Sequence, residues 1–485
     1  MTSKHNLIAG LIIASLLHAN LLQAAPASGV TLPELGDPAS STFSTQQEYD
    51  LGRAWLKMFR SQVRTVSDPL MQDYMEYLIY KLVSVSQVKD RRLEVVVVDN
   101  PTINAFAVPG GVVGVHNGAF LYADNEAELA SILGHELGHL SQRHFVRGVE
   151  QQQRNMLPMM AAMLGSLVLA ATAHGDVGMA GIAATQAAAQ QAQLSFSREN
   201  EQEADRVGME TLVKADYDPN AFAAMFENML AANRFAGRNP PEFLLTHPLT
   251  ESRVSDARNR ARDYVRKVYV DNLDFQLMRA RAEVQLSANS SEALKKFKAR
   301  LKGQSRNAEA DHYGLALAYL QAGQLREARD QLDPLLQKDQ RRLAYVITDT
   351  DIDVAAGVPD RAVEKLRAQL RVNPGNYPLS MAYADALLKA NQPQIAEGVL
   401  EDQARVRPTD PAVWYELAET HGLAGNILGV HQARAEYFVL NGILDKAEQQ
   451  LNYALQLTKK DPITTTKIEE RIRQIKTLKD QMEKM

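Results

Sequence analysis

The stretch GHELGHLSQRH, residues 134–144, places three histidines and one glutamate within eleven positions. It ends a longer segment, ADNEAELASILGHELGHLSQRH (123–144), which has apolar residues at helical spacing and acidic residues in its first turn. Asp124 or Asn125 is a suitable N-cap for this segment. The sequence therefore predicts one helix over 123–144 that carries all three histidines.

Two of these histidines share one face of the predicted helix. Successive residues of an α-helix turn by about 100°, so His135 and His139 lie about 40° apart, whereas His144 lies about 180° from His135. Glu136 lies within reach of anything that both imidazoles bind. This is the H-E-x-x-H arrangement, in which two histidines bind Zn²⁺ and the glutamate takes the proton of a water that attacks a carbonyl group. An amphipathic surface helix would show the same pattern by chance.

A catalytic zinc needs a third protein ligand and an open fourth position. The segment SFSRENEQEADRVG (195–208) supplies acidic residues on a second predicted helix, with Glu201 and Asp205 one turn apart on one face. We expect Glu201 to bind zinc and Asp205 to hydrogen-bond a ligand imidazole. An acid-rich helix is also typical of a solvated surface, so three histidines remain as alternative ligands: His116, His174 and His247.

The region before the helix is predicted to form a small β-sheet. LEVVVVD (93–99) is a β-branched run and predicts a strand, and NAFAVPGGVVGVHNGAF (104–120) predicts a hairpin with its turn at residues 109–111. In zinc peptidases an edge strand beside the active helix holds extended substrate by main-chain hydrogen bonds. The candidate for that strand is the run Gly111, Val112, Val113, Gly114, Val115 and His116. An ordinary sheet edge fits the same run.

The first 27 residues have the layout of a secretory signal. Lys4 precedes an apolar run of about ten residues, and small residues around Ala27 offer a cleavage site. The apolar run is short for a membrane span, and an uncleaved membrane anchor is the alternative. Residues 28–44 are rich in Ser, Thr, Pro and Gly and predict a loose arm. We expect an exported protein, which folds without disulfides because it contains no cysteine.

A second apolar segment, MLPMMAAMLGSLVLAATA (156–173), carries no charge over its eighteen residues. This length reaches the lower limit for a transmembrane helix, but Pro158 and Gly165 interrupt the run and Ala/Gln-rich sequence follows. We expect residues 156–193 to form an apolar hairpin that covers a cleft or makes peripheral contact with a membrane or partner. A transmembrane pair is the alternative.

The carboxy-terminal part has a period of 34 residues. Turn residues recur at that interval: Gly323, Gly357, Asn391 and Gly425. A small packing residue follows five positions after each: Ala328, Ala362, Ala396 and Val430. This pattern is the signature of tetratricopeptide repeats, in which two helices and a tight turn form each unit. We expect residues 269–485 to form an α-solenoid whose groove binds protein partners. The copy at 440–455 is out of phase, so the last unit is displaced or carries an extra helix.

Four motifs, taken in order and spacing, resemble the HtpX-like and CAAX-prenyl-protease-like gluzincin peptidases. They are NAFAVPGG (104–111), ELASILGHELGH (128–139), SRENEQEAD (197–205) and THPLTESR (246–253). The resemblance implies a zinc metallopeptidase domain over residues 45–268, mainly helical with a small β-sheet. Membrane-embedded relatives have transmembrane helices where this chain has residues 156–193, and a soluble form is our expectation.

The resemblance also implies roles for single residues. It implies one Zn²⁺ per chain, bound by His135, His139 and Glu201. It implies Glu136 as the catalytic acid/base, and Asp205 is treated in some members as a proton donor. With the export signal and the repeats, the chain resembles periplasmic members of Gram-negative bacteria. That implies misassembled or unfolded outer-membrane β-barrel proteins and their assembly machinery as partners.

His247 is a candidate residue for which three roles are considered. Pro248 favours an extended or loop conformation before it. His247 is then either a hydrogen-bond donor to the oxyanion or a loop ligand that occupies the open position of zinc and holds the enzyme latent. A surface histidine without a role is the third option. We favour the latch, because an unrestrained protease would damage unfolded proteins around it.

Two classes of function remain after composition is considered. The chain has 53 basic and 58 acidic side chains and a net charge of −5, which gives no support for a nucleic-acid partner, because such a partner requires a basic surface. The first class is an endopeptidase whose repeats deliver protein substrates. The second is a non-proteolytic chaperone or scaffold with a vestigial peptidase domain. Because Glu136 is present, we favour the endopeptidase, with chaperone-like docking by the repeats.

Overall fold

The computed structural model describes residues 44–151, 198–235, 241–303 and 305–483, all within one compact unit, Ser40–Met485. The predictions for the signal, for nearly all of the arm, for the apolar segment 156–193 and for His174 lie outside these residues. The domain boundary at 268/269 stays a prediction. Of the helices described, none combines the length and apolar character that crossing a membrane requires.

Two helices precede the sheet, and each begins at a side-chain cap. In α2 (Thr45–Gln62) the Ser44 hydroxyl accepts from the Gln47 N–H, and the Gln47 side chain accepts from the Ser44 N–H in return. In α3 (Pro69–Val85) the Asp68 carboxylate accepts from the first free N–H groups of the helix. These caps satisfy N–H groups that have no partner within the helix.

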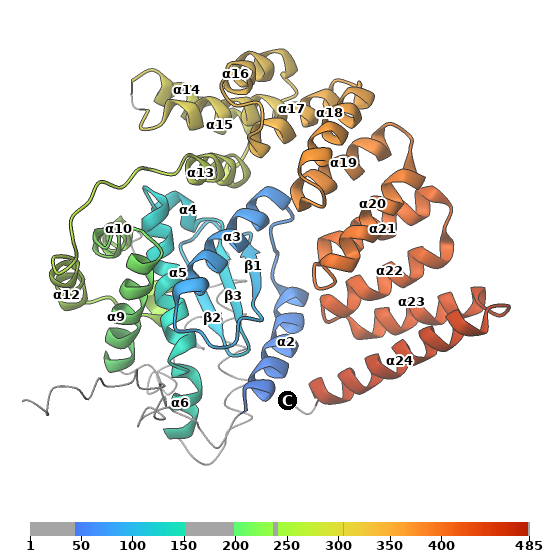
Figure 1. Ribbon diagram of the computed structural model, residues 1–485, viewed down its shortest axis with the longest axis horizontal. Coiled ribbons are helices and arrows are strands. Elements are labelled where there is room, and N and C mark those ends of the chain that lie inside the picture. The colour runs from blue at the N-terminus through green and yellow to red at the C-terminus, as the bar shows by residue number, and fades with distance from the viewer. Residues whose placement is uncertain (1–43, 152–197, 236–240, 304, 484–485) are drawn as a thin grey trace, which may run out of the picture. The chain divides into compact units, whose positions relative to one another are not determined.

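Three strands form one mixed sheet in the order β1–β3–β2 (Figure 1). Their bounds are β1 (Glu94–Val98), β2 (Ala105–Val108) and β3 (Val112–His116). β1 runs parallel to β3. β2, the first half of the predicted hairpin, runs antiparallel to β3, its second half. Gly110 and Gly111 have φ values of +82° and +78°, which residues with a side chain rarely adopt, so both glycines are needed at the turn.

The run Gly111–His116, which we expected at the edge of the sheet, lies in its middle, so that expectation is wrong. β3 is paired on both sides, and its main chain has no free side for an added strand. The outer positions belong to β1 and β2. Of these, β2 lies beside α5 (Glu126–Ser141), where the Ala107 N–H donates to the Glu136 carboxylate at 3.0 Å.

The helix with the H-E-x-x-H motif packs closely against α9 (Arg198–Lys214). A Cβ atom added at Gly208 would lie 2.8 Å from the main-chain nitrogen of His135, and one added at Gly138 would lie 2.8 Å from the Ala204 carbonyl oxygen. Only glycine permits this distance between the two backbones. The close contact places the first turn of α9 opposite the histidines of α5.

The predicted helix over 123–144 is shorter than we expected. Asn125 is its N-cap, and α5 ends at Ser141. Arg143 adopts a positive φ of 51°, and a new helix, α6 (His144–Gln151), begins after it. His144 therefore does not continue the helical rotation of His135, and its position cannot be obtained from helix geometry.

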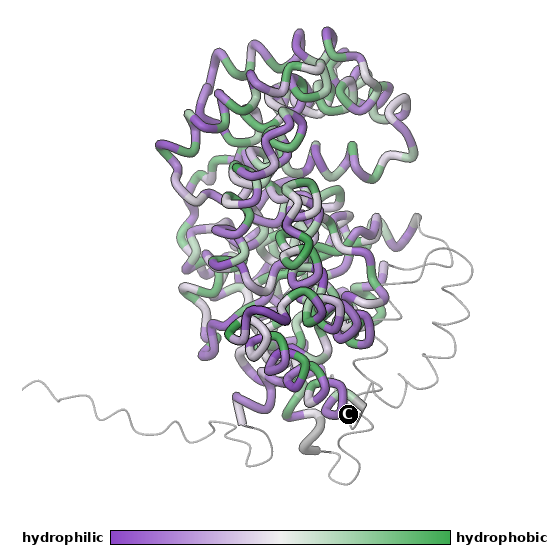
Figure 2. Tube along the Cα trace, turned by 90° about the vertical axis from the view of Figure 1, so that its right-hand side faces the viewer, coloured by the Kyte–Doolittle hydropathy of each residue, from purple (hydrophilic) through white to green (hydrophobic). Residues whose placement is uncertain are grey.

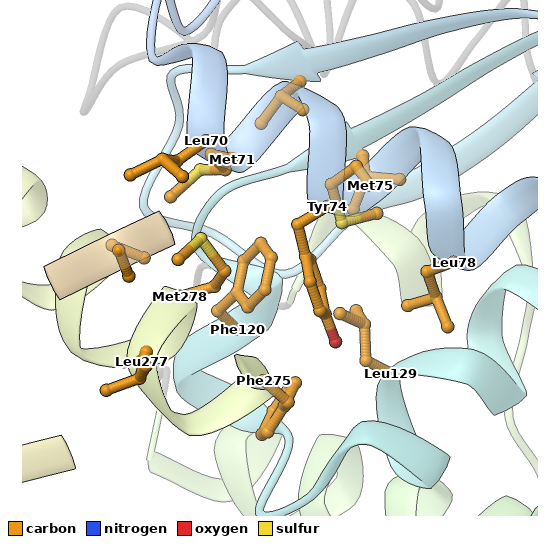
Figure 3. Packing of buried hydrophobic residues seen from close by; sticks show 14 of the residues in the cluster. Leu70, Met71, Tyr74, Met75, Leu78, Phe120, Leu129, Phe275, Leu277 and Met278 are labelled. Atoms are coloured by element: carbon orange, nitrogen blue, oxygen red, sulfur yellow. The ribbon is translucent and has the colours of Figure 1, made fainter. Parts of the chain in front are cut away.

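A continuous core joins the peptidase part to the first repeat helix. Within the described residues, the other helices of the peptidase part are α4 (Ala119–Tyr122), α10 (Asn220–Phe235), α11 (Glu242–Thr246) and α12 (Glu251–Ala261). The ring centroid of Phe120 in α4 lies 6.0 Å from those of Tyr74 in α3 and Phe275 in α13 (Leu273–Leu286) (Figure 3). Aromatic rings at this spacing pack favourably in a buried core, and both phenylalanines are fully buried.

Paired helices make up the rest of the chain (Figure 1). They are α13 (Leu273–Leu286), α14 (Ser290–Leu301), α15 (Ala308–Gln321), α16 (Leu325–Lys338), α17 (Leu343–Ala355), α18 (Pro359–Val372), α19 (Tyr377–Lys389), α20 (Pro393–Val406), α21 (Pro411–Ala424), α22 (Ile427–Leu440), α23 (Leu444–Leu457) and α24 (Pro462–Glu483). Hydrophilic and hydrophobic segments are interspersed along the described trace (Figure 2).

The 34-residue period corresponds to the turns between these helices. The four predicted turn residues all have positive φ values, from 58° to 83°: Gly323, Gly357, Asn391 and Gly425. The packing residues Ala328, Ala362 and Ala396 are completely buried. The out-of-phase copy forms α23, and α24 follows it as a helix of 22 residues. The fold class, a mainly helical peptidase part with a small sheet followed by an α-solenoid, is confirmed.

Candidate active site

Four side chains with metal-ligand chemistry converge in the peptidase part. His135 and His139 come from α5, Glu201 from the first turn of α9, and His247 from the residue after α11. All four are buried, and one ligand atom of each lies within 4.8 Å of the others. The sequence named all four as candidates, and the fold brings them together from three separate segments.

The distances within this cluster are those expected around a tetrahedral ion. Nε2 of His135 lies 3.1 Å from Nε2 of His139 and 3.5 Å from one oxygen of Glu201. The other Glu201 oxygen lies 3.4 Å from Nε2 of His139. Ligands about 2.0–2.1 Å from a tetrahedral zinc ion lie about 3.3 Å from one another. The residues present therefore fit zinc.

The members of the cluster differ in their pKa values and therefore in their protonation. Burial holds the pKa of His139 well below its usual value, so this imidazole is neutral. Burial acts against ionisation of Glu201, but the surrounding histidines hold its pKa well below the usual range. Burial also acts to lower the pKa of His135, yet Asp205 and Glu201 raise it to about 9. A metal ion must therefore displace a proton from His135.

Glu136 lies beside the cluster and not within it. One of its oxygens accepts the Ala107 N–H of β2, and the other lies 3.4 Å from Nε2 of His247. Burial raises the pKa of this carboxyl above its ordinary value. A carboxylate with a raised pKa, held next to a metal site, is suited to take a proton and return it.

His135 is held from behind by a carboxylate and an arginine. Its Nδ1 lies 2.9 Å from Asp205, one turn after Glu201 on α9. Arg253 of α12 donates two parallel hydrogen bonds to Asp205, at 2.7 and 2.8 Å, and its third nitrogen lies 2.9 Å from Glu201. This fork of charge-assisted contacts fixes both carboxylates relative to the histidine.

His139 is held by a longer chain of side chains. Its Nδ1 lies 2.8 Å from Nδ1 of His144, and Nε2 of His144 lies 3.0 Å from Glu203. Arg147 donates to the same Glu203 oxygen at 2.9 Å. If Nε2 of His139 binds a metal, its Nδ1 carries the proton and donates it to His144.

His247 lies between the ligands and Glu136. Its Nδ1 is 3.1 Å from Glu201 and 3.4 Å from Nε2 of His135, whereas its Nε2 faces Glu136. The main-chain N–H of His247 bonds to the Phe243 carbonyl, and the two rings pack with centroids 4.7 Å apart. The histidine is thus directed into the site by α11 and is not a surface residue.

The alternative ligand His116 lies elsewhere. It is fully buried at the end of β3, with Nδ1 3.1 Å from the Thr102 hydroxyl and 3.8 Å from Glu242. It does not belong to the ligand cluster. The other alternative, His174, lies outside the described residues.

Known proteins share this combination of motifs and repeats. The model of peptidase family M48 matches residues 69–261, and a tetratricopeptide-repeat model matches residues 353–419. The chain is 36% identical over 486 residues to the beta-barrel assembly-enhancing protease of Escherichia coli O157:H7, covering 98% of this chain and 97% of that one. The chain belongs to peptidase family M48.

Other relatives extend the M48 assignment. The putative beta-barrel assembly-enhancing protease of Vibrio cholerae is 34% identical over 448 residues, or 92% of each chain. The mitochondrial metalloendopeptidase OMA1 of Schizosaccharomyces pombe is 32% identical over 187 residues, which is 37% of this chain and 50% of that one. The expectation of a metallopeptidase with tetratricopeptide repeats is confirmed.

Two residues of the M48 site were missed by sequence reasoning. Arg253 lies within the quoted motif THPLTESR. The sequence does not show that its side chain contacts two carboxylates on another helix. The signal that could have identified Arg253 is its position as a basic residue shortly after the candidate ligand His247. His144 was set aside because the helix was assumed to continue through it, and the sequence carries no clear signal for the break at Arg143.

Proposed function

We propose that this protein is a zinc-dependent endopeptidase in which His135, His139 and Glu201 bind the metal. The observation that carries the proposal is the convergence of these three side chains at tetrahedral spacing, with Glu136 directly beside them. Zinc, when bound, supplies a Lewis acid that polarises a peptide carbonyl and lowers the pKa of water. Asp205 keeps His135 oriented and is a positioning residue in this proposal.

Glu136 performs the proton transfers in this proposal. It removes the proton of the attacking water and returns it to the nitrogen of the leaving amine as the peptide bond breaks. The Ala107 N–H, bonded at 3.0 Å to one of its oxygens, fixes the carboxylate relative to β2. The base is therefore aligned with the strand beside it.

The outer edge of β2 replaces β3 as the proposed substrate strand. Asn104 accepts the His116 N–H at 3.0 Å, so by alternation in an antiparallel pair Ala105 and Ala107 direct their main-chain groups away from β3. These groups lie on the side where Glu136 contacts the strand. An extended substrate paired there would pass directly by the cluster.

His247 is the proposed latch of the enzyme. Its Nδ1 lies at ligand spacing from Glu201 and His135, and its Nε2 lies 3.4 Å from Glu136. In this position the imidazole lies next to Glu136 and would serve as the fourth ligand of a bound metal. The α11 segment that carries it also touches the continuation of the β2 edge, where the Phe243 N–H donates to Ile103. Pairing of a substrate with β2 would therefore compete with α11.

The proposed substrates are misassembled or unfolded outer-membrane β-barrel proteins, with the repeats binding the substrate or the assembly machinery. The names of the E. coli and V. cholerae relatives support this, since both are called beta-barrel assembly-enhancing proteases. The signal-like layout of residues 1–27 supports a periplasmic location.

The test is proteolysis of an unfolded outer-membrane protein by the purified chain. We expect fragments with the unmodified protein, none after chelation, and recovery when zinc is restored. Glu136→Gln should keep about one zinc per chain and lose hydrolysis, because the residue is a base and not a ligand. Full hydrolysis by that variant would refute the role of Glu136 as the base, whereas no hydrolysis by the unmodified, zinc-loaded chain would favour the non-proteolytic chaperone.

A further inference from the structure

A cavity of about 700 Å³ lies between the sheet of the peptidase part and the repeats. One wall comes from β1 and the start of α3, and the other from α17, α19 and α21. Ion pairs connect the walls: Arg407 of the repeats contacts Glu76 at 2.5 Å, and Arg281 of α13 contacts Asp68. The two walls of the cavity are therefore held together by side-chain contacts within one compact unit.

The walls of this cavity carry more negative than positive charge. Its lining contains three cations, Arg60, Arg281 and Arg407, and seven acidic residues: Asp68, Glu76, Glu94, Asp351, Asp385, Asp410 and Glu416. All three cations are engaged. Arg60 contacts Glu94, Arg281 contacts Asp68, and Arg407 contacts Glu76 and Asp410.

Three of the carboxylates have no such partner. Asp351, Asp385 and Glu416 accept no hydrogen bond and form no ion pair with any described residue. Asp351 and Asp385 are 34 residues apart, at equivalent positions of successive repeats. Burial raises the pKa of all three carboxyls, that of Asp351 to about 7. All three carboxylates therefore line the cavity without a hydrogen bond or ion pair from the described residues.

The chemistry of the cavity distinguishes between ligand classes. None of the three carboxylates belongs to a described group whose ligand atoms lie within 4.8 Å of one another, so they do not form a cage for a metal ion. The lining also includes Tyr415 and Val406, with 49% and 70% of their surface exposed. Spaced carboxylates beside exposed apolar side chains suit a polypeptide with alternating basic and apolar residues.

The β1 edge does not supply a free ladder for this polypeptide. The carbonyl of Val95 accepts from the Gln72 side chain at 2.9 Å, and that of Val97 accepts from the Val66 N–H at 2.8 Å. Addition of a strand needs such carbonyls. Recognition in this cavity must therefore come from side chains, and above all from the carboxylates.

We propose that the cavity binds an extended segment of a partner protein through lysine or arginine side chains that pair with Asp351, Asp385 and Glu416. This deepens the proposed docking role of the repeats and requires neither zinc nor peptide hydrolysis. The cavity lies on the β1 side of the sheet, whereas Glu136 contacts β2 at the opposite edge. A segment held here is thus bound apart from the scissile bond.

The test measures binding of a fluorescein-labelled peptide of about twelve residues that alternates lysine with valine. The protein is the full chain with Glu136→Gln, so that the peptide is not cleaved, and anisotropy gives the affinity. We expect the peptide to bind, and its counterpart with glutamate in place of lysine not to bind. The triple variant Asp351→Asn, Asp385→Asn, Glu416→Gln should weaken binding about tenfold or more.

The matched control removes the same charges outside the cavity. Asp330, Asp333 and Glu364 are exposed carboxylates on α16 and α18, and none lines the cavity. Their change to Asn, Asn and Gln should leave the affinity unchanged. Equal weakening by both triple variants would mean attraction by net charge alone and would overturn the proposal.

Two further outcomes decide the remaining questions. Free spermine is added until its amino groups match the lysine side chains of the peptide in concentration. If spermine then displaces the peptide, the cavity selects small polyamines, and the protein-segment proposal is wrong. Asp385→Asn alone, at an exposed side chain, replaces the triple variant if the latter loses its circular dichroism spectrum. If Asp385→Asn then binds the lysine peptide as tightly as the protein without this change, the proposal is also overturned. If the unmodified chain binds the peptide but cleaves no unfolded protein, only the endopeptidase function is refuted.

Discussion

At the scale of single residues, His135 and His139, the two histidines proposed to bind the metal, differ in the side chains that hold them. His135 meets a carboxylate directly, whereas His139 meets a second imidazole, His144, which then meets Glu203. The contact of His135 with Asp205 can be predicted from the sequence, because Asp205 comes one helical turn after Glu201. The relay through His144 follows from a break between two helices. Sequence reasoning found the first and missed the second.

His144 gives a prediction about metal affinity. His144→Phe keeps the ring volume but removes the acceptor for the Nδ1–H of His139, so zinc affinity should fall about 10–100-fold. Competition with a chromophoric chelator measures this without any proteolysis. His144→Gln, whose amide oxygen can accept the same hydrogen, should recover part of the loss. Unchanged affinity in the Phe variant would mean that His144 only fills space.

His247 gives the opposite kind of prediction. His247→Ala should raise basal hydrolysis of casein and leave about one zinc per chain, because the imidazole that occupies the fourth position is removed while three ligands remain. Metal content is measured in the same sample. A rate that falls about 10²–10³-fold with metal retained would instead assign His247 to stabilisation of the oxyanion.

At the scale of elements, the site depends on how closely α5 and α9 approach. Gly208→Ala would place a methyl group 2.8 Å from the His135 nitrogen, so α9 must move away and take Glu201 with it. We expect a loss of about 1–3 kcal/mol in the free energy of unfolding and weaker zinc binding. Thermal unfolding and chelator competition measure the two effects.

The control for this change is the same substitution at Gly398 in α20. A Cβ atom there meets nothing within 4 Å, and alanine is the better helix former, so Gly398→Ala should stabilise by about 0.5–1 kcal/mol. If both variants changed stability in the same direction, the close approach of α5 and α9 would not be the reason.

Elements also show where prediction from sequence succeeds and fails. The repeats were predictable because each turn is local: Gly357 and Asn391 adopt positive φ values at a fixed distance from their packing alanines. The order of the strands was not, because a hairpin of β2 and β3 does not reveal which strand β1 joins. Arg253 was missed for the same reason, since its partner Asp205 lies 48 positions away along the chain.

At the scale of the whole molecule, the cavity links pH to stability. Asp351 faces Arg281, Asp68 and Asp385, and burial raises its pKa to about 7. The folded chain therefore keeps this proton to a higher pH than the unfolded chain, whose aspartates titrate near about 3.9. Stability from this group falls as the pH rises between these two values and stays reduced above about 7.

Asp351→Asn removes this dependence. The variant should be more stable than the unmodified chain at pH 8, by about 1–2 kcal/mol after allowance for water in the cavity, and equally stable at pH 4. Thermal unfolding across this range measures the difference. A variant that is less stable at pH 8 would show that the charged carboxylate is compensated in the folded protein.

The fork of Arg253 has a consequence for how the protein matures. Its guanidinium holds Asp205 and Glu201 in place, and Asp205 in turn holds His135, by contacts between side chains alone. Folding can therefore precede metallation, and the folded chain can take up its ion late, wherever zinc is available. The chelated protein should keep its helical circular dichroism and regain activity without refolding. Unfolding on chelation would show that the ion arrives first.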